Sequence, residues 1–455
     1  MDTIAAIATG TGVGGIGIVR VSGDKAFEIG ETLFDGKRAF SDILANYLAH
    51  GNVVRQGQII DEAMFVKMAA PKSFTKEDVV EIHCHGGRVV LGQILDLTLQ
   101  LGARLAEPGE FTKRAFLNGR IDLSQAEAVI DLINAKTFES SQTALKQLEG
   151  RLSERVGIAK QVLVELIAHL EVSVDYPEYD IETLTATRLS QGIQNALQIV
   201  EGLLKGYERG RLLREGVTVA ITGKPNVGKS SLLNRLAGRQ RAIVTEIPGT
   251  TRDIIDDFID LNGIPVRIVD TAGIRETHDA VEKIGVEMAR KEVAEANLVV
   301  VLLDAETGVS SEEFEMIEAL KTTQKILVVL NKIDKSGSVS ALPEIASLQV
   351  SLLEDTGVEV LIEELGRLVA GDAAGGVGAA PQAGDVLVTN ARHKQLLDQS
   401  RVSLGAAEVA LAEGAPLDCL AVDLMAAVNA LAEITGESVS ESIVNEIFSK
   451  FCIGK

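Results

Sequence analysis

The alternation of apolar and polar residues divides the chain into stretches of different periodicity. The first stretch mixes short β-type runs with glycine turns, and residues 16–21 and 79–85 are its clearest strand candidates. Two stretches have the 3.6-residue periodicity of helices, and between them strand-like and helical segments alternate, as in a doubly wound sheet. The predicted boundaries are 1–119 for the first stretch, 120–212 and 386–455 for the helical pair, and 215–370 for the alternating one.

The order of these stretches predicts that one domain is inserted into another. Insertion is tolerated because the two ends of a domain often lie close together. Residues 371–385 are rich in Gly and Ala, and we expect them to be a linker. The predicted fold class is therefore multidomain α/β and α: an N-terminal α+β domain, a discontinuous helical domain and an inserted Ras-like P-loop domain.

Local patterns add detail to these elements. Ser124 with Glu127 has the spacing of a capping box at a helix start. The apolar runs 299–303 and 326–330 are typical of buried parallel strands and too short to span a bilayer. One helical face is predicted to carry Ile158, Val162, Leu163, Leu166, Ile167 and Leu170.

Composition narrows the functional classes. The formal net charge is −21, which argues against a protein that coats nucleic acid with a broadly basic surface. Three widely spaced cysteines do not form a disulfide framework and fit a reducing compartment. The first residues have no basic segment of a secretory signal. We expect a cytoplasmic protein without membrane insertion.

Residues 223–230, Gly-Lys-Pro-Asn-Val-Gly-Lys-Ser, fit the pattern of a phosphate-binding loop. The required context is present, because residues 217–221 are strand-like and residues 231–236 begin a helical pattern. The glycines let backbone N–H groups approach phosphates, and the helix N-terminus adds positive potential. We expect Lys229 to reach the β- and γ-phosphates and Ser230 to ligate Mg²⁺.

The sequence Asp270-Thr271-Ala272-Gly273 follows an apolar strand candidate, residues 266–269. A carboxylate at the end of a strand can hold Mg²⁺ through water, and the glycine lets the backbone meet the γ-phosphate. The value of this short motif lies in its order after the phosphate loop.

The sequence Asn331-Lys332-Ile333-Asp334 follows a second apolar run and predicts how the base is read. The Asp334 carboxylate can accept both the N1–H and the N2–H₂ of guanine, and adenine offers no such donor pair. Residues Ser351, Leu352 and Leu353 are the candidate loop behind the base. The three motifs together predict a GTP-hydrolysing enzyme.

Two details differ from a Ras-type switch. Ile274 follows Gly273, where Ras-type enzymes have the Gln that orients water. Asn226 lies inside the phosphate loop, and its carbonyl oxygen can hold a monovalent cation beside the phosphates, as a substitute for an arginine finger. Thr251 is the candidate switch threonine for Mg²⁺.

The predicted nucleotide contacts are Asn226, Val227, Gly228, Lys229, Ser230, Ser231, Thr245, Glu246, Ile247, Pro248, Gly249, Thr250, Thr251, Asp270, Thr271, Ala272, Gly273, Asn331, Lys332, Asp334, Ser351, Leu352 and Leu353.

With both chain ends, these motifs resemble the MnmE (TrmE) family of tRNA wobble-uridine modification GTPases over the whole chain. The distinctive segments outside the nucleotide motifs are residues 14–23, 73–82, 108–119 and 451–455, the last reading Phe-Cys-Ile-Gly-Lys. One departure is Lys76, where the family usually has Gly, and we interpret it as a surface change in a turn.

The resemblance implies a homodimer whose N-terminal domain binds 5,10-methylene- or 5-formyl-tetrahydrofolate. The folate contacts that it implies are Arg20, Glu81, Arg120 and Lys455. Glu can accept pterin N–H groups, and Arg or Lys can meet the folate carboxylates. Without the resemblance, Arg20 on an edge strand would be interpreted as a solvated charge.

In the GTPase part the resemblance implies a potassium site at Asn226, Thr245, Ile247 and Thr250, and catalytic roles for Glu282 and Lys229. Glu282 would position water when two GTPase domains meet. The implied partners are tRNA and the FAD-dependent protein MnmG (GidA), in a complex of heterotetramer type.

The implied reaction adds a carboxymethylaminomethyl or aminomethyl group to C5 of the wobble uridine, with the carbon of methylene-tetrahydrofolate. Two alternatives stay open. The first is a regulatory or ribosome-assembly GTPase that binds RNA and alters no base. The second concerns Cys452, which is either a nucleophile near the folate or a small buried apolar residue.

Overall fold

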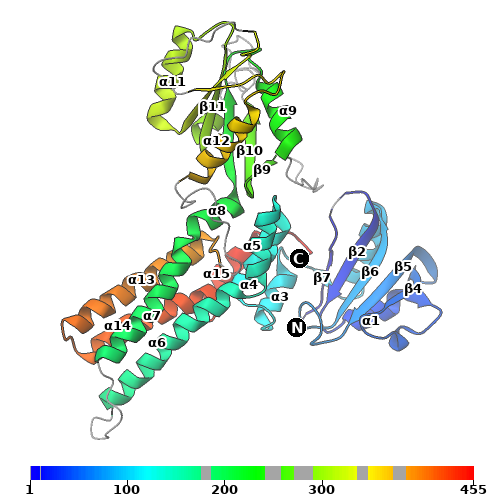
Figure 1. Ribbon diagram of the computed structural model, residues 1–455. Helices are drawn as coiled ribbons and strands as arrows, with labels where there is room; N and C mark the ends of the chain where they lie inside the picture. Colours follow the sequence, from blue (N-terminus) through cyan, green and yellow to red (C-terminus); the bar gives the residue numbers. More distant parts are fainter. Residues whose placement is uncertain are drawn as a thin grey trace.

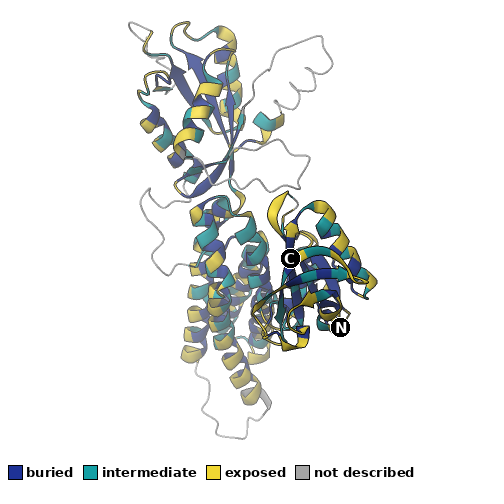
Figure 2. Ribbon diagram, turned by 90° about the vertical axis from the view of Figure 1, so that its right-hand side faces the viewer, coloured by how far each residue is buried: buried dark blue, intermediate teal, exposed yellow. Residues whose placement is uncertain are grey.

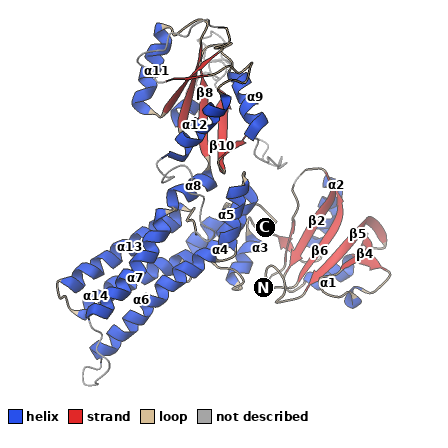
Figure 3. Cartoon of the chain, in the orientation of Figure 1, coloured by secondary structure: helices blue, strands red, loops and turns tan. Residues whose placement is uncertain are grey.

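The computed structural model describes residues 2–10, 12–175, 186–240, 258–270, 291–335, 347–371 and 386–454. Figure 1 shows two α/β parts, one at the top and one at the right, and a long helical part that extends from them towards the lower left. This arrangement confirms the predicted fold class. The strands form two separate sheets, one in each α/β part. Figure 3 shows that the described residues of the long third part form helices.

The N-terminal part is built on a seven-stranded sheet of order β3-β4-β5-β6-β2-β1-β7. The predicted strands at 16–21 and 79–85 are confirmed as β2 and β6, which pair antiparallel with Arg20 opposite Glu81. Helices α1 (Ala26–Leu33) and α2 (Arg88–Gln100) cover the sheet. The strands are β1 (Ile4–Ile7), β2 (Gly14–Ser22), β3 (Phe34–Gly36), β4 (Leu48–Arg55), β5 (Gln58–Met68), β6 (Val79–Gly86) and β7 (Arg104–Leu105).

The helical part combines two distant regions of the chain. One apolar core joins side chains of α6, α7, α13 and α14, so residues near 160 and near 430 pack side by side. Its helices are α3 (Glu110–Leu117), α4 (Leu123–Asn134), α5 (Phe138–Leu148), α6 (Arg151–Asp175), α7 (Ala186–Lys205), α8 (Tyr207–Glu215), α13 (Ala391–Ala412), α14 (Leu417–Thr435) and α15 (Glu441–Ser449). None of the described helices is both long and apolar enough to cross a bilayer.

Two local predictions in this part were wrong. The capping box of α4 is formed by Asp122 and Gln125, because the helix begins one residue before Ser124. Asp122 is as good a cap as Ser, and Glu127 lies inside the helix with its carboxylate buried. The apolar face of α6 excludes Ile158, which is 45% exposed, although Leu163 is fully buried.

The inserted part contains a six-stranded sheet of order β13-β12-β11-β8-β10-β9, parallel except for the edge strand β9. The runs 299–303 and 326–330 are confirmed as interior strands, and Figure 2 shows the buried centre of this sheet. The elements are β8 (Val217–Thr222), α9 (Lys229–Gln240), β9 (Phe258–Leu261), β10 (Ile264–Asp270), β11 (Leu298–Asp304), α11 (Ser311–Thr323), β12 (Ile326–Asn331), β13 (Ser347–Gln349) and α12 (Val358–Ala370).

Candidate functional site

The predicted phosphate loop connects β8 to α9, at the carboxyl ends of the parallel strands. Its two outer glycines adopt backbone angles that favour glycine, with φ of +146° at Gly223 and +106° at Gly228. A Cβ atom at Gly223 would lie 2.3 Å from the carbonyl oxygen of Leu302, and one at Gly228 would lie 2.5 Å from Nδ2 of Asn331. The loop therefore packs so closely against two strands that side chains are excluded at both positions.

The ammonium group of Lys229 lies over this loop. Its Nζ donates to the carbonyl oxygens of Gly223 at 2.8 Å and Lys224 at 3.0 Å. These are weak neutral acceptors compared with a phosphate oxygen, so a triphosphate in the loop would compete well for the same donor.

The loop is also braced from one side by α11, which the sequence analysis did not foresee. Nζ of Lys224 donates to Ser310 Oγ at 2.7 Å and to Glu313 Oε2 at 3.1 Å. Ser310 and Glu313 form the capping box of α11. That box is legible in the sequence as Ser-x-x-Glu, but the partner of its carboxylate is not.

The base-reading motif is bonded to the phosphate loop and to the loop after β13. Asn331 is buried, and its amide donates to the carbonyl oxygen of Val227 at 2.8 Å and accepts from Leu352 N at 3.1 Å. Ser351 Oγ donates to Asp334 Oδ1 at 2.6 Å. Three predicted segments that are far apart in sequence therefore meet, with the Asp334 carboxylate held in one orientation.

Lys332 has a partner that the sequence analysis missed. Its Nζ donates to Asp304 Oδ2 at 2.6 Å, and Asp304 ends β11. Burial is the largest influence and raises the pKa of the Asp304 carboxyl, but the hydrogen bonds from Lys332 and from the backbone of Glu306, together with the charges of Lys332 and Lys335, outweigh it, so the net pKa is lowered. The available signal was position, because Asp304 lies at the same sheet edge as the predicted motifs.

Several predicted nucleotide residues lie outside the described residues: Thr245, Glu246, Ile247, Pro248, Gly249, Thr250, Thr251, Thr271, Ala272, Gly273 and the catalytic candidate Glu282. Asp270 ends β10, beside Ile221 of β8. Asn226 adopts a left-handed conformation with φ of +66° at the exposed surface of the loop. Ser230 and Ser231 are exposed in the first turn of α9, and Leu353 is exposed after Ser351.

A second group of predicted residues meets in the N-terminal part. Arg20 Nε donates to Glu81 Oε1 at 2.8 Å, and His83 Nε2 lies 3.0 Å from Glu81 Oε2. Burial raises the pKa of Glu81, but the charge of Arg20 and the hydrogen bonds from His83 and Arg20 give a net lowering. The expectation of an edge strand was wrong, because β2 lies between β6 and β1 and holds Arg20 against a partner on each side.

The C-terminal tail reaches this group. Arg20 Nη1 lies 3.5 Å from the carbonyl oxygen of Gly454, the neighbour of Lys455, which is itself outside the described residues. Gly454 packs against β1, since a Cβ there would lie 2.3 Å from the carbonyl oxygen of Ile7. Cys452 is exposed, so its interpretation as a buried apolar residue was wrong.

Arg120 and Arg20 both contact aromatic rings of one apolar cluster in the N-terminal part. The Arg120 guanidinium stacks 4.6 Å from the Phe74 ring centre, and that of Arg20 lies 5.6 Å from the Phe111 ring centre. Both rings belong to one cluster with Ile4, so the structure brings both arginines to it. The turn that contains Lys76 has φ of +58° there, which accounts for the Gly that the family prefers.

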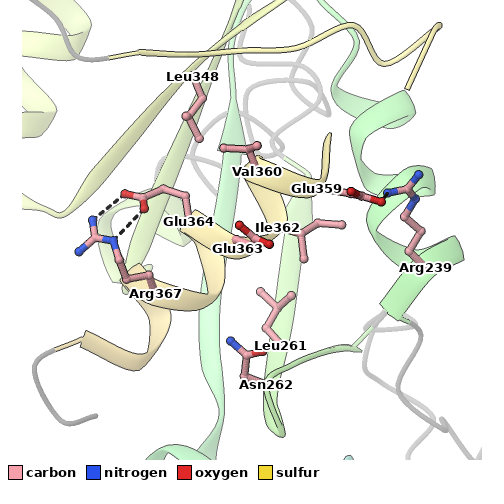
Figure 4. A pocket seen from close by; sticks show the side chains of 10 residues that line it. All are labelled: Arg239, Leu261, Asn262, Leu348, Glu359, Val360, Ile362, Glu363, Glu364 and Arg367. Carbon is pink, nitrogen blue, oxygen red and sulfur yellow. Dashed lines mark hydrogen bonds and ion pairs between the residues drawn. The ribbon is translucent and has the colours of Figure 1, made fainter. Parts of the chain in front are cut away.

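A hollow of about 730 Å³ lies elsewhere on the inserted part, around α12 and β9 (Figure 4). Both of its arginines pair with carboxylates of the same hollow, Arg367 with Glu364 at 2.6 Å and Arg239 with Glu359 at 3.8 Å. It contains none of the predicted nucleotide residues. Among the described residues, no group of three or more acidic, His or Cys side chains could hold a metal ion.

Comparisons with known proteins agree with this geometry. Residues 3–120 match the family model for the GTP-binding protein TrmE N-terminus, and residues 123–452 match that for the MnmE helical domain. The chain is 50% identical to the tRNA modification GTPase MnmE of Acetivibrio thermocellus, covering 100% of this chain and 99% of that protein. It is 46% identical to that of Shouchella clausii, with 100% of each chain covered.

Among solved structures, an Era variant of Aquifex aeolicus bound to GDP and AlF₄⁻ is 26% identical and covers 41% of this chain and 66% of that chain. Its TM-score is only 0.28, so the fold assignment rests on the strand order described above. The alternative of a GTPase that alters no base finds no support in these relatives, which are named tRNA modification GTPases. The chain belongs to the MnmE family of tRNA modification GTPases.

Proposed function

We propose that this GTP hydrolase acts with an FAD-dependent partner, MnmG (GidA), on the wobble uridine of certain tRNAs. The product is uridine with a carboxymethylaminomethyl or aminomethyl group at C5; methylene-tetrahydrofolate supplies the carbon bonded to C5, and glycine or ammonium supplies the nitrogen. The observation that carries the proposal is that Arg20 contacts both Glu81 and the C-terminal tail, because this builds a polar group from the N-terminal part and the end of the chain.

In the nucleotide site, backbone N–H groups of the phosphate loop and Lys229 would hold the phosphates, and Ser230 with Thr251 would hold Mg²⁺. The magnesium ion would neutralise charge on the β- and γ-phosphates. Asp334 would select guanine, since its carboxylate is kept in place by Ser351. The tight packing at Gly223 and Gly228 supports a backbone cradle for phosphates.

The potassium proposal is carried by Asn226, with Thr245, Ile247 and Thr250 as further oxygen donors. The side chain of Asn226 is exposed at the loop and neutral, which suits a monovalent cation better than a divalent one. We also propose that GTPase domains pair in a cytoplasmic homodimer, and that Glu282 then positions the attacking water.

In the folate site, Glu81 would accept the pterin N–H groups, while Arg20, Arg120 and Lys455 would meet the folate carboxylates. Glu81 fits this role because the charges around it keep it ionised. Cys452 is exposed next to the tail and available for the one-carbon chemistry.

The test is a reconstituted reaction with the partner protein, unmodified tRNA, GTP, glycine or ammonium as the nitrogen donor, and isotopically labelled methylene-tetrahydrofolate. We expect Glu81→Gln to abolish transfer of label to uridine, read by nucleoside mass spectrometry, while GTP hydrolysis continues. Glu62→Gln is the matched control, since Glu62 is an exposed carboxylate on the neighbouring strand β5 and pairs with the exposed His50. Normal labelling by Glu81→Gln would contradict the folate assignment.

A further inference from the structure

Helix α5 presents a buried polar face that does not belong to either candidate site. This face is formed by Thr137, the N-cap residue of α5, with Ser140 and Gln147 of the helix itself, at spacings that place them on one side. Each of the three side chains makes a hydrogen bond to backbone of the inserted part or of its connections. A buried polar side chain costs free energy unless it is bonded, so these contacts specify one arrangement.

The first contact reaches the turn between β9 and β10. Thr137 Oγ1 donates to the carbonyl oxygen of Gly263 at 2.6 Å. Asn262 and Gly263 have φ of +56° and +85°, the conformation of a two-residue hairpin turn. A Cβ at Gly263 would lie 2.5 Å from Cγ of Glu139, so the turn is pressed against α5. Lys136 Nζ also lies 5.2 Å from the Phe258 ring centre of β9.

The second contact holds the chain where it enters the inserted part. Ser140 Oγ donates to the carbonyl oxygen of Leu213, in the last turn of α8. Next to it, Arg214 Nε donates to Asp131 Oδ1 of α4 at 2.8 Å. Two successive residues of α8 are therefore tied to the α4–α5 pair, just before β8 begins.

The third contact holds the chain where it returns. Gln147 Nε2 donates to the carbonyl oxygen of Leu387 at 2.8 Å and to Thr389 Oγ1 at 3.1 Å. The returning segment packs directly on α8, because a Cβ at Gly210 would lie 2.1 Å from the carbonyl oxygen of Val388. Helix α5 with its N-cap residue is therefore hydrogen-bonded to the segment that enters the inserted part, to the segment that leaves it, and to the β9–β10 hairpin of its sheet.

The hairpin is the contact that nucleotide binding can move. In the sequence its turn lies between two of the candidate magnesium residues: Thr251 precedes β9, and Asp270 ends β10. The two strands are paired antiparallel from Phe258 to Arg267, and their turn is where Thr137 is bonded. We propose that the buried polar face of α5 fixes the orientation of the GTPase domain on the helical domain, and that the Thr137–Gly263 contact passes nucleotide-dependent movement between them.

The test measures the distance between the two domains in the full-length protein by electron–electron double resonance. Spin labels go on Cys419, which is exposed in the first turn of α14, and on Glu315→Cys in α11. Cys452→Ser removes the other exposed thiol. Labelled protein is diluted with unlabelled protein so that only distances within one chain are read, with no nucleotide, with GDP and with a non-hydrolysable GTP analogue.

In the wild type we expect a narrow distance distribution that shifts between GDP and the GTP analogue. Thr137→Val should broaden it and reduce the shift by at least half, whereas Thr137→Ser, which keeps the hydroxyl, should restore both. Ser140→Ala should also broaden the distance distribution. It leaves the N-cap residue Thr137 in place, so it tests the proposal even if Thr137→Val weakens the start of α5.

Thr143→Val is the matched control, because Thr143 is buried on the same face and makes none of the three contacts. Its distribution should equal that of the wild type. The proposal is overturned if the wild-type distance is the same in all nucleotide states, or if Thr137→Val and Ser140→Ala leave both width and shift unchanged.

Discussion

The side-chain amide of Asn331 donates to the carbonyl oxygen of Val227 at 2.8 Å, which joins the end of β12 to the phosphate loop. A Cβ atom at residue 228 would lie only 2.5 Å from the same amide nitrogen. One contact therefore sets both the distance between the base-reading and phosphate-binding segments and the need for glycine in the loop.

Gly228→Ala is expected to weaken GTP binding by at least about tenfold, equal to roughly 1.4 kcal/mol. The new methyl group would displace Asn331, and the φ of +106° strains any L residue by about 1–3 kcal/mol. Titration with a fluorescent GTP analogue measures the loss. Gly238→Ala is the control, since Gly238 has open space around it inside α9 and the change should stabilise the protein by about 0.5–1 kcal/mol. Equal affinity of the Gly228 variant and the wild type would show that the loop is not held as described.

Asp334→Asn should lower GTP affinity by about 10- to 100-fold, because a charged acceptor of two base N–H groups becomes a neutral one. Affinity for xanthosine triphosphate should rise, since the Asn amide can donate to the carbonyl that xanthine has in place of the guanine amino group. Competition between the two nucleotides measures the change in preference. Glu354→Gln removes an exposed carboxylate near the same loop and should leave the preference alone. Unaltered guanine selectivity in Asp334→Asn would remove its base-reading role.

Much of the nucleotide site was predictable because its chemistry depends on short contiguous motifs. Asp334 and Ser351 were both predicted, and they meet at 2.6 Å. Asp304 and Glu313 were missed because their partners, Lys332 and Lys224, are distant in sequence and pair only through the sheet edge and the start of α11.

Strand order and exposure were harder to predict than element type. The pattern around Arg20 predicts a strand but does not say that β1 and β6 flank it, so the side chain was assigned to an edge. The face of α6 was predicted one residue too wide, because Ile158 has the right spacing but no neighbouring helix covers it. Periodicity reports which residues share a face and not what packs against it.

Hydrolysis of GTP should be faster in potassium than in sodium at equal ionic strength, by up to about 10³-fold if the cation replaces an arginine finger fully. Asn226→Ala should lose most of this difference, because it lacks the carbonyl oxygen offered by the loop. Phosphate release under steady-state conditions measures both rates, with choline chloride as the control for ionic strength. Equal wild-type rates in potassium and sodium would refute the cation site.

Glu127 should make the helical part sensitive to acid. Burial alone would raise the pKa of its carboxyl, but the charge and hydrogen bonds of His393 and Arg392 outweigh burial and lower the pKa to about 2. A carboxyl whose pKa is lower in the folded state stabilises the protein above the pKa of the unfolded chain, near 4.5, and this contribution is lost as the pH falls towards 2. The shift corresponds to about 3 kcal/mol at neutral pH.

The free energy of unfolding of Glu127→Gln should therefore be about 3 kcal/mol lower than that of the wild type at pH 7. This gap in stability should narrow as the pH falls from 4.5 towards 2. Unfolding followed by circular dichroism at several pH values measures the gap. Glu364→Gln removes a surface partner of Arg367 and should cost at most about 1 kcal/mol, because exposed ion pairs are screened by water. A gap that stays constant from pH 7 to pH 3 would mean that packing, and not the charge of Glu127, holds the start of α13 against α4.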